Sequence, residues 1–163
     1  MKGFLQATQL KIRAGQPGDV AALARLFTDT VRSVNAKDYS PEQIDAWAPE
    51  PPDLEHWRGR LSGSEVLVAE QDTKITGFAT LESNGHLDQL YVHHQFQRKG
   101  IASALCRSIE REARRRNLQR VFTEASITAR PFFESAGFRV ITPQTIEYKG
   151  IFYKNYRMEK ILC

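Results

Sequence analysis

The run from Leu87 to Leu105 constrains this chain most, because an apolar segment leads through a basic, glycine-containing loop directly into a segment with helical periodicity. The first N–H groups of such a helix have no intrahelical partner and point toward the loop. Within the loop, the absent side chain of Gly100 and the small one of Ala102 let a ligand approach the main chain. Residues 97–102, Gln-Arg-Lys-Gly-Ile-Ala, therefore predict an anion site suited to a pyrophosphate.

The spacing of this loop excludes two common phosphate motifs. The chain contains neither G-x-x-x-x-G-K-[ST] nor G-x-G-x-x-G, so it has no P-loop and no dinucleotide-binding fingerprint. A simple strand-to-helix turn, with Gly100 easing the backbone and Arg98 and Lys99 solvated, would have the same six residues. The hexapeptide alone is compatible with both interpretations, because short glycine motifs also occur by chance.

Length and composition predict a single domain in a reducing compartment. A chain of 163 residues is typical of one domain, and its longest apolar run is well short of the roughly 20 residues that span a bilayer. The first nine residues lack the apolar core of a signal peptide, so we expect a cytoplasmic protein without a membrane partner. Its two cysteines, Cys106 and Cys163, form neither a disulfide framework nor a metal-binding spacing. The net charge of +4 favours an anionic partner, either a polyphosphate cofactor or nucleic acid.

Strand and helix patterns alternate along the chain, with short polar links that favour antiparallel pairing. The fold class predicted is α/β (α+β), with a mixed, mostly antiparallel, twisted sheet of about seven strands flanked by helices. Helices are expected at 17–31, 41–47, 54–61, 101–116 and 128–136, and strands at 10–14, 66–69, 75–81, 87–92, 121–125, 140–148 and 151–158.

A second motif follows the first at residues 126–138, Ser-Ile-Thr-Ala-Arg-Pro-Phe-Phe-Glu-Ser-Ala-Gly-Phe. It resembles the pattern N-x-x-A-x-x-x-Y-x-x-x-G-F of the GNAT superfamily of N-acetyltransferases, and Q-x-x-G-x-A at 97–102 resembles the acyl-CoA loop of that superfamily. The resemblance covers a single domain at 10–160, with residues 1–9 and 161–163 as terminal tails. The segments 39–48 and 125–134 look most like its YafP-like branch.

The resemblance implies transfer of the acetyl group of acetyl-CoA directly to a primary amine, on a small molecule or on a peptide or protein. It also implies that the main-chain N–H of Leu90 stabilises the oxyanion formed from the acetyl carbonyl. The positions that match the cofactor site of the family are Leu90, Tyr91, Val92, Gln97, Arg98, Lys99, Gly100, Ile101, Ala102, Ser103, Ser126, Ala129, Phe132 and Phe133.

Two positions of the second motif depart from the family pattern, and the loop of the first motif has His94 where the family often has a proline after the fourth strand. Ser126 stands where the pattern has asparagine, and Phe133 stands where it has the tyrosine often assigned as the general acid. A phenyl ring cannot donate a proton, but a thiolate with a pKa of roughly 8.5 leaves without much help. Another tyrosine (Tyr39, Tyr91 or Tyr153) or water would be a substitute acid. The alternative function is a non-catalytic, GNAT-like domain that binds acyl-CoA.

A base is required because an alkylammonium acceptor with a pKa near 10.4 is only about one part in a thousand free amine at neutral pH. In the family this role often belongs to a carboxylate early in the fourth strand, and the matching position here is His86. Strand alternation places Asp88 on the same face, two residues nearer the loop. We expect Asp88 to be the base, with His86 as the alternative.

Other chemistries are not favoured by the sequence. Cys106 lies on the inward half of its helix and is expected to pack, and adjacent His93 and His94 point to opposite sides of an extended chain, so no metal site is predicted. The arginines at 114–116 suit the end of a helix, so no nucleic-acid partner is expected. Three aromatic residues are expected either to line the acceptor pocket or to pack in the core: Tyr39, Trp47 and Trp57. The sequence leaves open the acceptor and the oligomeric state, monomer or homodimer.

Overall fold

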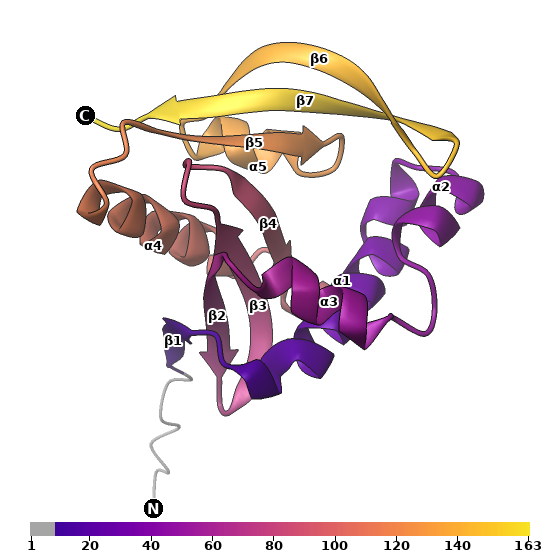
Figure 1. Cartoon of the computed structure of the whole chain (residues 1–163), viewed down its shortest axis with the longest axis horizontal. Coiled ribbons are helices and arrows are strands. Elements are labelled where there is room, and N and C mark those ends of the chain that lie inside the picture. The colour runs from indigo at the N-terminus through magenta and orange to yellow at the C-terminus, as the bar shows by residue number, and fades with distance from the viewer. Residues whose placement is uncertain (1–8) are drawn as a thin grey trace, which may run out of the picture.

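The computed structural model describes residues 9–163, which form two antiparallel sheets (Figure 1). Residues 1–8 of the predicted N-terminal tail lie outside the described residues. The first sheet has the order β1-β2-β3-β4, formed by Leu10–Ala14, Glu65–Gln71, Lys74–Leu81 and Leu87–Val92. The second has the order β5-β7-β6, formed by Arg120–Ser126, Ile151–Ile161 and Arg139–Tyr148. The prediction of a mostly antiparallel arrangement of about seven strands is confirmed.

The two sheets meet at one end of β4 and β5. His86 and Phe122 form an isolated parallel bridge, the N–H of Phe122 donates to the carbonyl of Gly85 at 3.1 Å, and the hydroxyl of Thr123 donates to the carbonyl of Leu87 at 2.8 Å. From there the two strands run in different directions (Figure 1). This junction makes the arrangement mixed, and the divergence leaves one edge of β4 open.

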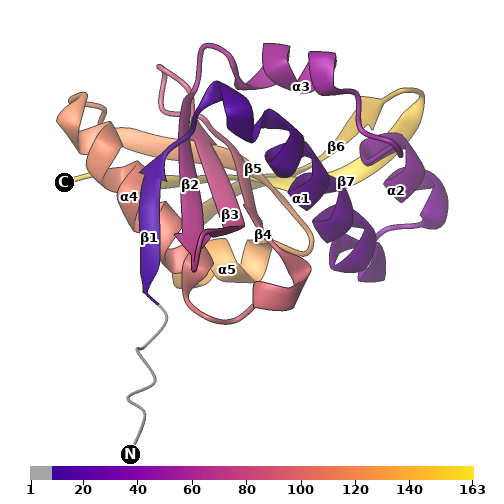
Figure 2. The same ribbon diagram turned by 90° about the horizontal axis from the view of Figure 1, so that it is seen from below.

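Helices cover both faces of the first sheet (Figure 2). On one face, α1 and α3 contribute Leu23, Phe27 and Trp57 to a buried cluster with Phe78 of β3, next to the short helix α2. On the other face, α4 packs Leu105 and its neighbours into a second cluster, which α5 joins beside β5 and β7. The helices are α1 Val20–Ser33, α2 Pro41–Trp47, α3 Leu54–Leu61, α4 Ile101–Arg115 and α5 Arg130–Ser135.

The start signals read from the sequence act as expected at α2. Ser40 accepts a hydrogen bond from the N–H of Gln43 at 3.2 Å, and the Gln43 carboxamide accepts one from the N–H of Ser40 at 2.8 Å. Pro41 follows at the first helical position, where its missing N–H is not needed. This capping box fixes the start of a seven-residue helix that borders the site described below.

Three expectations about local structure were wrong. The last helix is Arg130–Ser135 rather than 128–136. The predicted C-terminal tail is part of the fold, because β7 extends to Ile161 and Leu162 is buried, with its N–H donating to Gln119 at 2.8 Å. His93 and His94 do not point apart: their rings stack with centroids 4.4 Å apart, because the chain turns into a 3₁₀ helix at His94.

The expected packing role of Cys106 is confirmed, since its side chain is 2% exposed within the α4 cluster. No helix within residues 9–163 is both long and apolar enough to cross a bilayer.

Gly77 of β3 lies directly beneath the start of α4. A Cβ at this position would lie 3.0 Å from the carbonyl oxygen of Tyr91, 3.1 Å from Leu105 and 3.2 Å from Ile101. We expect Gly77→Val to lower the melting temperature by about 5 °C, because overpacking costs roughly 1–3 kcal/mol. Thermal unfolding monitored by circular dichroism measures this shift. Gly18→Ala, whose added Cβ has no neighbour within 4 Å, is the control, and an equal loss in both variants would contradict the packing argument.

Candidate active site

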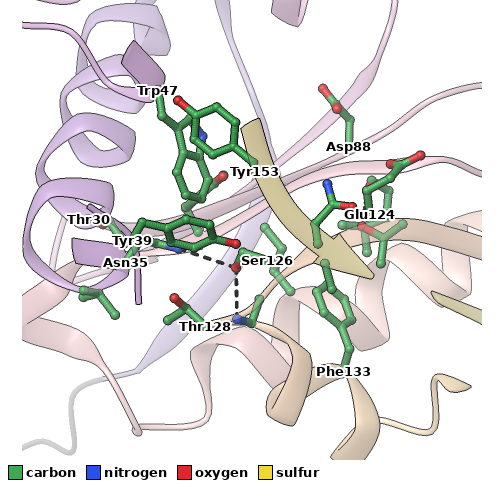
Figure 3. A pocket seen from close by; sticks show the side chains of 18 of the residues that line it. Thr30, Asn35, Tyr39, Trp47, Asp88, Glu124, Ser126, Thr128, Phe133 and Tyr153 are labelled. Carbon is green, nitrogen blue, oxygen red and sulfur yellow. Dashed lines mark hydrogen bonds between the residues drawn. The ribbon is translucent and has the colours of Figure 1, made fainter. Parts of the chain in front are cut away.

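A cavity of about 1150 Å³ opens where β4 and β5 diverge (Figure 3). Its walls come from β4, the end of β5, the start of α5, the segment joining α1 to α2, α3 and the β6–β7 hairpin. Both predicted bases, Asp88 and His86, line it. The predicted cofactor residues in its lining are Leu90, Tyr91, Val92, Gln97, Ala102, Ser126, Ala129, Phe132 and Phe133.

The open edge of β4 presents main-chain groups to this cavity. The N–H of His93 donates to Thr76 of β3 at 2.8 Å, so residues an even number of positions away also direct their polar groups toward β3. The main-chain groups of Tyr91 therefore face β3, contrary to the prediction that they serve pantetheine. Those of Leu90 and Val92 face away from β3, as the predicted oxyanion role of the Leu90 N–H requires.

The carbonyl of Val92 is already satisfied by two side chains. It accepts hydrogen bonds from the hydroxyl of Thr30 on α1 at 3.1 Å and from the carboxamide of Gln97 at 2.6 Å. The Gln97 side chain thus ties the glycine loop to the end of β4, which leaves its main chain to contribute to a ligand site.

The loop before α4 has the backbone that an anion site needs. Gly100 adopts a left-handed conformation with a φ of 79°, and a Cβ there would meet nothing within 4 Å. The first intrahelical bond runs from Ala104 to Gly100, so the N–H groups of Ile101, Ala102 and Ser103 have no partner inside the helix. The side chain of Ile101 is buried in the core, so only its main chain is available to a ligand.

Ser126 is held by groups from two distant segments. Its hydroxyl oxygen accepts the N–H of Ala129 at 3.0 Å and the carboxamide of Asn35 at 3.5 Å (Figure 3). Asn35 is buried and lines the cavity, and it places a carboxamide beside the position where the family pattern has asparagine. Asn35 could not be predicted from the sequence, because no local pattern indicates that a residue 91 positions away will contact Ser126.

The tyrosines considered as substitutes for the missing acid are engaged or buried. The hydroxyl of Tyr39 donates to the carbonyl of Lys154 and accepts the N–H of Ile127, both at 2.9 Å, and the hydroxyl of Tyr153 donates to the carbonyl of Gln43 at 2.7 Å. Burial raises the pKa of Tyr39, Tyr91 and Tyr153. The hydroxyls of Tyr39 and Tyr153 therefore hold the cavity walls together.

Of the three aromatic residues expected in the core or the acceptor pocket, two line the cavity and one lies in the core. Trp47 and Tyr39 line the cavity, with ring centroids 5.3 Å apart, whereas Trp57 is buried against Phe27 at 4.8 Å. Phe133 is 3% exposed and packs edge to face on Phe138, with its ring at the cavity surface.

His86 is not available as a base, which corrects the alternative assignment. Its Nδ1 lies 3.2 Å from Glu82 and its Nε2 lies 2.5 Å from Glu124, while the ring stacks on Phe122. Burial lowers the pKa of His86, but the hydrogen bonds and charges of the carboxylates outweigh it and raise the pKa to about 9. The imidazole is therefore protonated at neutral pH. The hydrogen bond from His86 lowers the pKa of Glu124 in turn.

Asp88 lies beside this ion pair. One of its carboxylate oxygens is 3.5 Å from Nε of Arg60 on α3, and Asp88, His86 and Glu82 each place a polar atom within 4.8 Å of the others. Figure 3 shows Asp88 and Glu124 on the side of the cavity opposite Trp47 and Tyr39. A carboxylate and an aromatic wall thus face the same space.

Residues 35–160 match the family model described as an acetyltransferase (GNAT) domain. The chain is also 34% identical over 149 residues to the uncharacterised N-acetyltransferase YafP of Escherichia coli, covering 91% of this chain and 94% of YafP. This chain belongs to the GNAT family of acetyltransferases. Acetyl-CoA is the cosubstrate of the family, and the predicted resemblance to GNAT enzymes, including YafP, is confirmed.

Two solved structures show the same fold. A GCN5-related N-acetyltransferase from Rhodopseudomonas palustris has a TM-score of 0.90 and 30% sequence identity, covering 96% of this chain and 99% of its own. YncA from Salmonella typhimurium, solved with acetyl-CoA, has a TM-score of 0.70 and 23% identity, covering 94% of each chain. The mixed, mostly antiparallel arrangement is therefore that of the GNAT fold.

The ion pair of His86 gives stability a defined pH dependence. The pKa of His86 is raised from 6.5 to about 9 on folding, so its stabilisation is fully present below pH 6.5 and is lost as the pH rises through 9. We expect His86→Gln to lower the free energy of unfolding by about 2 kcal/mol at pH 6, and by little at pH 10. Urea unfolding across this range measures the difference. His56→Gln, at an exposed histidine, is the control, and a pH-independent loss for His86→Gln would contradict the assignment.

Proposed function

We propose that the chain transfers the acetyl group of acetyl-CoA directly to a primary amine, on a small molecule or on a peptide or protein. The observation that carries this proposal is that one cavity joins both motifs, since Gln97 and Ala102 of the loop and Ser126 and Phe133 of the second motif all line it. The same cavity extends to Trp47 and the β6–β7 hairpin, which leaves room for an acceptor beyond the thioester.

In this proposal the pyrophosphate of the cosubstrate binds at the start of α4. The unpaired N–H groups of residues 101–103 and the helix dipole favour an anion there, and Arg98 and Lys99 add positive charge. The pantetheine arm then runs along the open edge of β4, past Val92 and Leu90. Ala129 and Phe132 form the opposite wall.

The transfer itself needs an oxyanion donor and a base. The acceptor nitrogen attacks the thioester carbon, and the developing oxyanion is stabilised by the N–H of Leu90, a contact worth roughly 3 kcal/mol in comparable enzymes. Asp88 takes the proton lost by the acceptor nitrogen, directly or through a water molecule. The C–N bond forms, the C–S bond breaks, and CoA leaves as a thiolate that takes a proton from water.

A second candidate is a GNAT domain that binds acyl-CoA without turnover. It is favoured by Phe133, which carries no acidic proton, and by the engagement of the Tyr39 and Tyr153 hydroxyls in main-chain hydrogen bonds. Release of free CoA in the presence of a panel of amines decides between the two, because a domain that only binds would release none.

The pyrophosphate site predicts a charge-specific effect at Gly100. Acetyl-CoA and CoA are expected to raise the melting temperature, whereas NAD and ATP are not, because a ligand that binds only the native state stabilises it. Gly100→Asp should abolish this shift and Gly100→Asn should retain most of it, since both side chains tolerate the left-handed conformation and only one repels a phosphate. Thermal shift assays test both statements. Equal stabilisation by all four ligands, or equal losses in the two variants, would argue against the site.

The base assignment predicts a change in the pH–rate profile. Asp88→Asn is expected to lower turnover about a hundredfold at neutral pH, with partial recovery at high pH where free amine is abundant, and to leave the affinity for acetyl-CoA unchanged. The measurement is the pH dependence of kcat with an amine that the wild type acetylates. Asp45→Asn, at an exposed carboxylate outside the cavity lining, serves as the control. An unaltered profile in Asp88→Asn would rule out this residue.

A further inference from the structure

We infer that Asn155 binds the acceptor, accepting a hydrogen bond from the nitrogen that is acetylated. This inference rests on the proposed transfer to an amine and assigns a further residue to its acceptor side. Asn155 lies in β7, outside both sequence motifs.

The strand register places Asn155 in the middle of a polar row. It pairs with Ser126 of β5 on one side and with Gln144 of β6 on the other, so the three side chains lie next to one another on the same face of the second sheet. All three line the cavity. Ser126 belongs to the second motif, so Asn155 stands one strand farther from the β4 edge, toward the acceptor side.

The Asn155 side chain has an unused acceptor in a buried position. It is 8% exposed, and its Oδ1 has no hydrogen-bond partner among the residues that the structure describes. Its polar neighbours on the same face are engaged elsewhere. The hydroxyl of Tyr153 donates to the carbonyl of Gln43, and the hydroxyl oxygen of Ser126 already accepts hydrogen bonds from two donors. A buried carboxamide oxygen is normally paired. The carboxamide of Gln89 is also unpaired but lies outside the cavity lining, whereas Asn155 lines the cavity, so its Oδ1 can take an N–H or O–H from a ligand.

An amine acceptor in this cavity would supply that donor. A neutral carboxamide accepts an N–H from the acceptor without adding charge, whereas a carboxylate in the same position would favour the ammonium form and oppose its deprotonation. An uncharged carboxamide such as that of Asn155 can therefore hold the acceptor nitrogen while Asp88 removes its proton. The titratable and charged side chains that line the same cavity as Asn155 are His86, Asp88 and Tyr91 at β4, Glu124 from β5, Tyr153 from β7, Glu147 and Tyr148 from β6, Tyr39 from the segment before α2, and Glu55, His56 and Arg60 from α3.

The test compares Asn155→Leu and Asn155→Asp with the wild type, using benzylamine, cadaverine, lysinamide and an alanine-initiated tripeptide as acceptors. Asn155→Leu is expected to lower kcat/KM for the acetylated amine at least tenfold, with the CoA dissociation constant changed less than twofold. Asn155→Asp, which keeps the size of the side chain, is expected to shift the rise of the pH–rate profile upward by about one pH unit. Gln89→Leu, which removes a buried carboxamide outside the cavity lining, is the control and should leave both quantities unchanged.

The outcomes separate this inference from the proposed function. A tenfold loss of CoA affinity in Asn155→Leu with an unchanged KM for the amine would show that Asn155 holds the cosubstrate, and unchanged kinetics in both variants would show that it holds nothing. Either result overturns the inference and leaves the acetyltransferase proposal intact. If the wild type acetylates none of the four amines, the proposed transfer fails first. Calorimetric titration of the same amines into CoA-loaded protein then tests whether Asn155 binds the acceptor. If it does, Asn155→Leu binds the amines more weakly than the wild type, and equal binding overturns the inference.

Discussion

The site depends on the divergence of two strands that meet at only one end. β4 and β5 are joined at the His86–Phe122 bridge and by the hydrogen bond from Thr123 to Leu87, and beyond these contacts they separate. An unpaired strand edge in the interior of a protein requires partners for its N–H and C=O groups. Thr30 and Gln97 satisfy the carbonyl of Val92, which leaves the N–H of Leu90 for a ligand. The divergence of β4 and β5 therefore produces both the cavity and the unpaired N–H of Leu90 at its wall.

Electrostatics reinforce this junction. The imidazolium of His86 lies between Glu82 and Glu124 and stacks on Phe122, so one side chain from the end of the first sheet binds two elements of the fold together. Because the proton is held on His86, the proposed transfer assigns the role of base to Asp88, the carboxylate of β4 that lines the cavity. The same ion pair that joins the strands therefore disfavours His86, which the sequence had offered as the alternative base to Asp88.

Residues from other parts of the chain surround the two positions of the second motif that depart from the family pattern. Asn35 brings a carboxamide to Ser126, and Asn155 stands beside Ser126 on the next strand. Phe133 is packed on Phe138 and contributes shape to the cavity rather than a proton. A phenyl ring at this position is compatible with acetyl transfer because a thiolate is a good leaving group, so in the proposed reaction the main demands on the site are holding and deprotonating the acceptor.

The sequence by itself determined most of the elements and the turn at Gly100 that leads into α4. Local signals are sufficient for these, because the capping box at Ser40 and the glycine before Ile101 act within a few residues. The family was readable for the same reason, since each of its motifs is a short contiguous segment. Only the tertiary structure decided that His86 is held between two carboxylates, that the hydroxyls of Tyr39 and Tyr153 are engaged, and that Asn35 and Asn155 line the cavity. Those properties depend on contacts between residues tens of positions apart, such as His86 with Glu124, and burial and charge at such contacts exist only after the sheets are assembled.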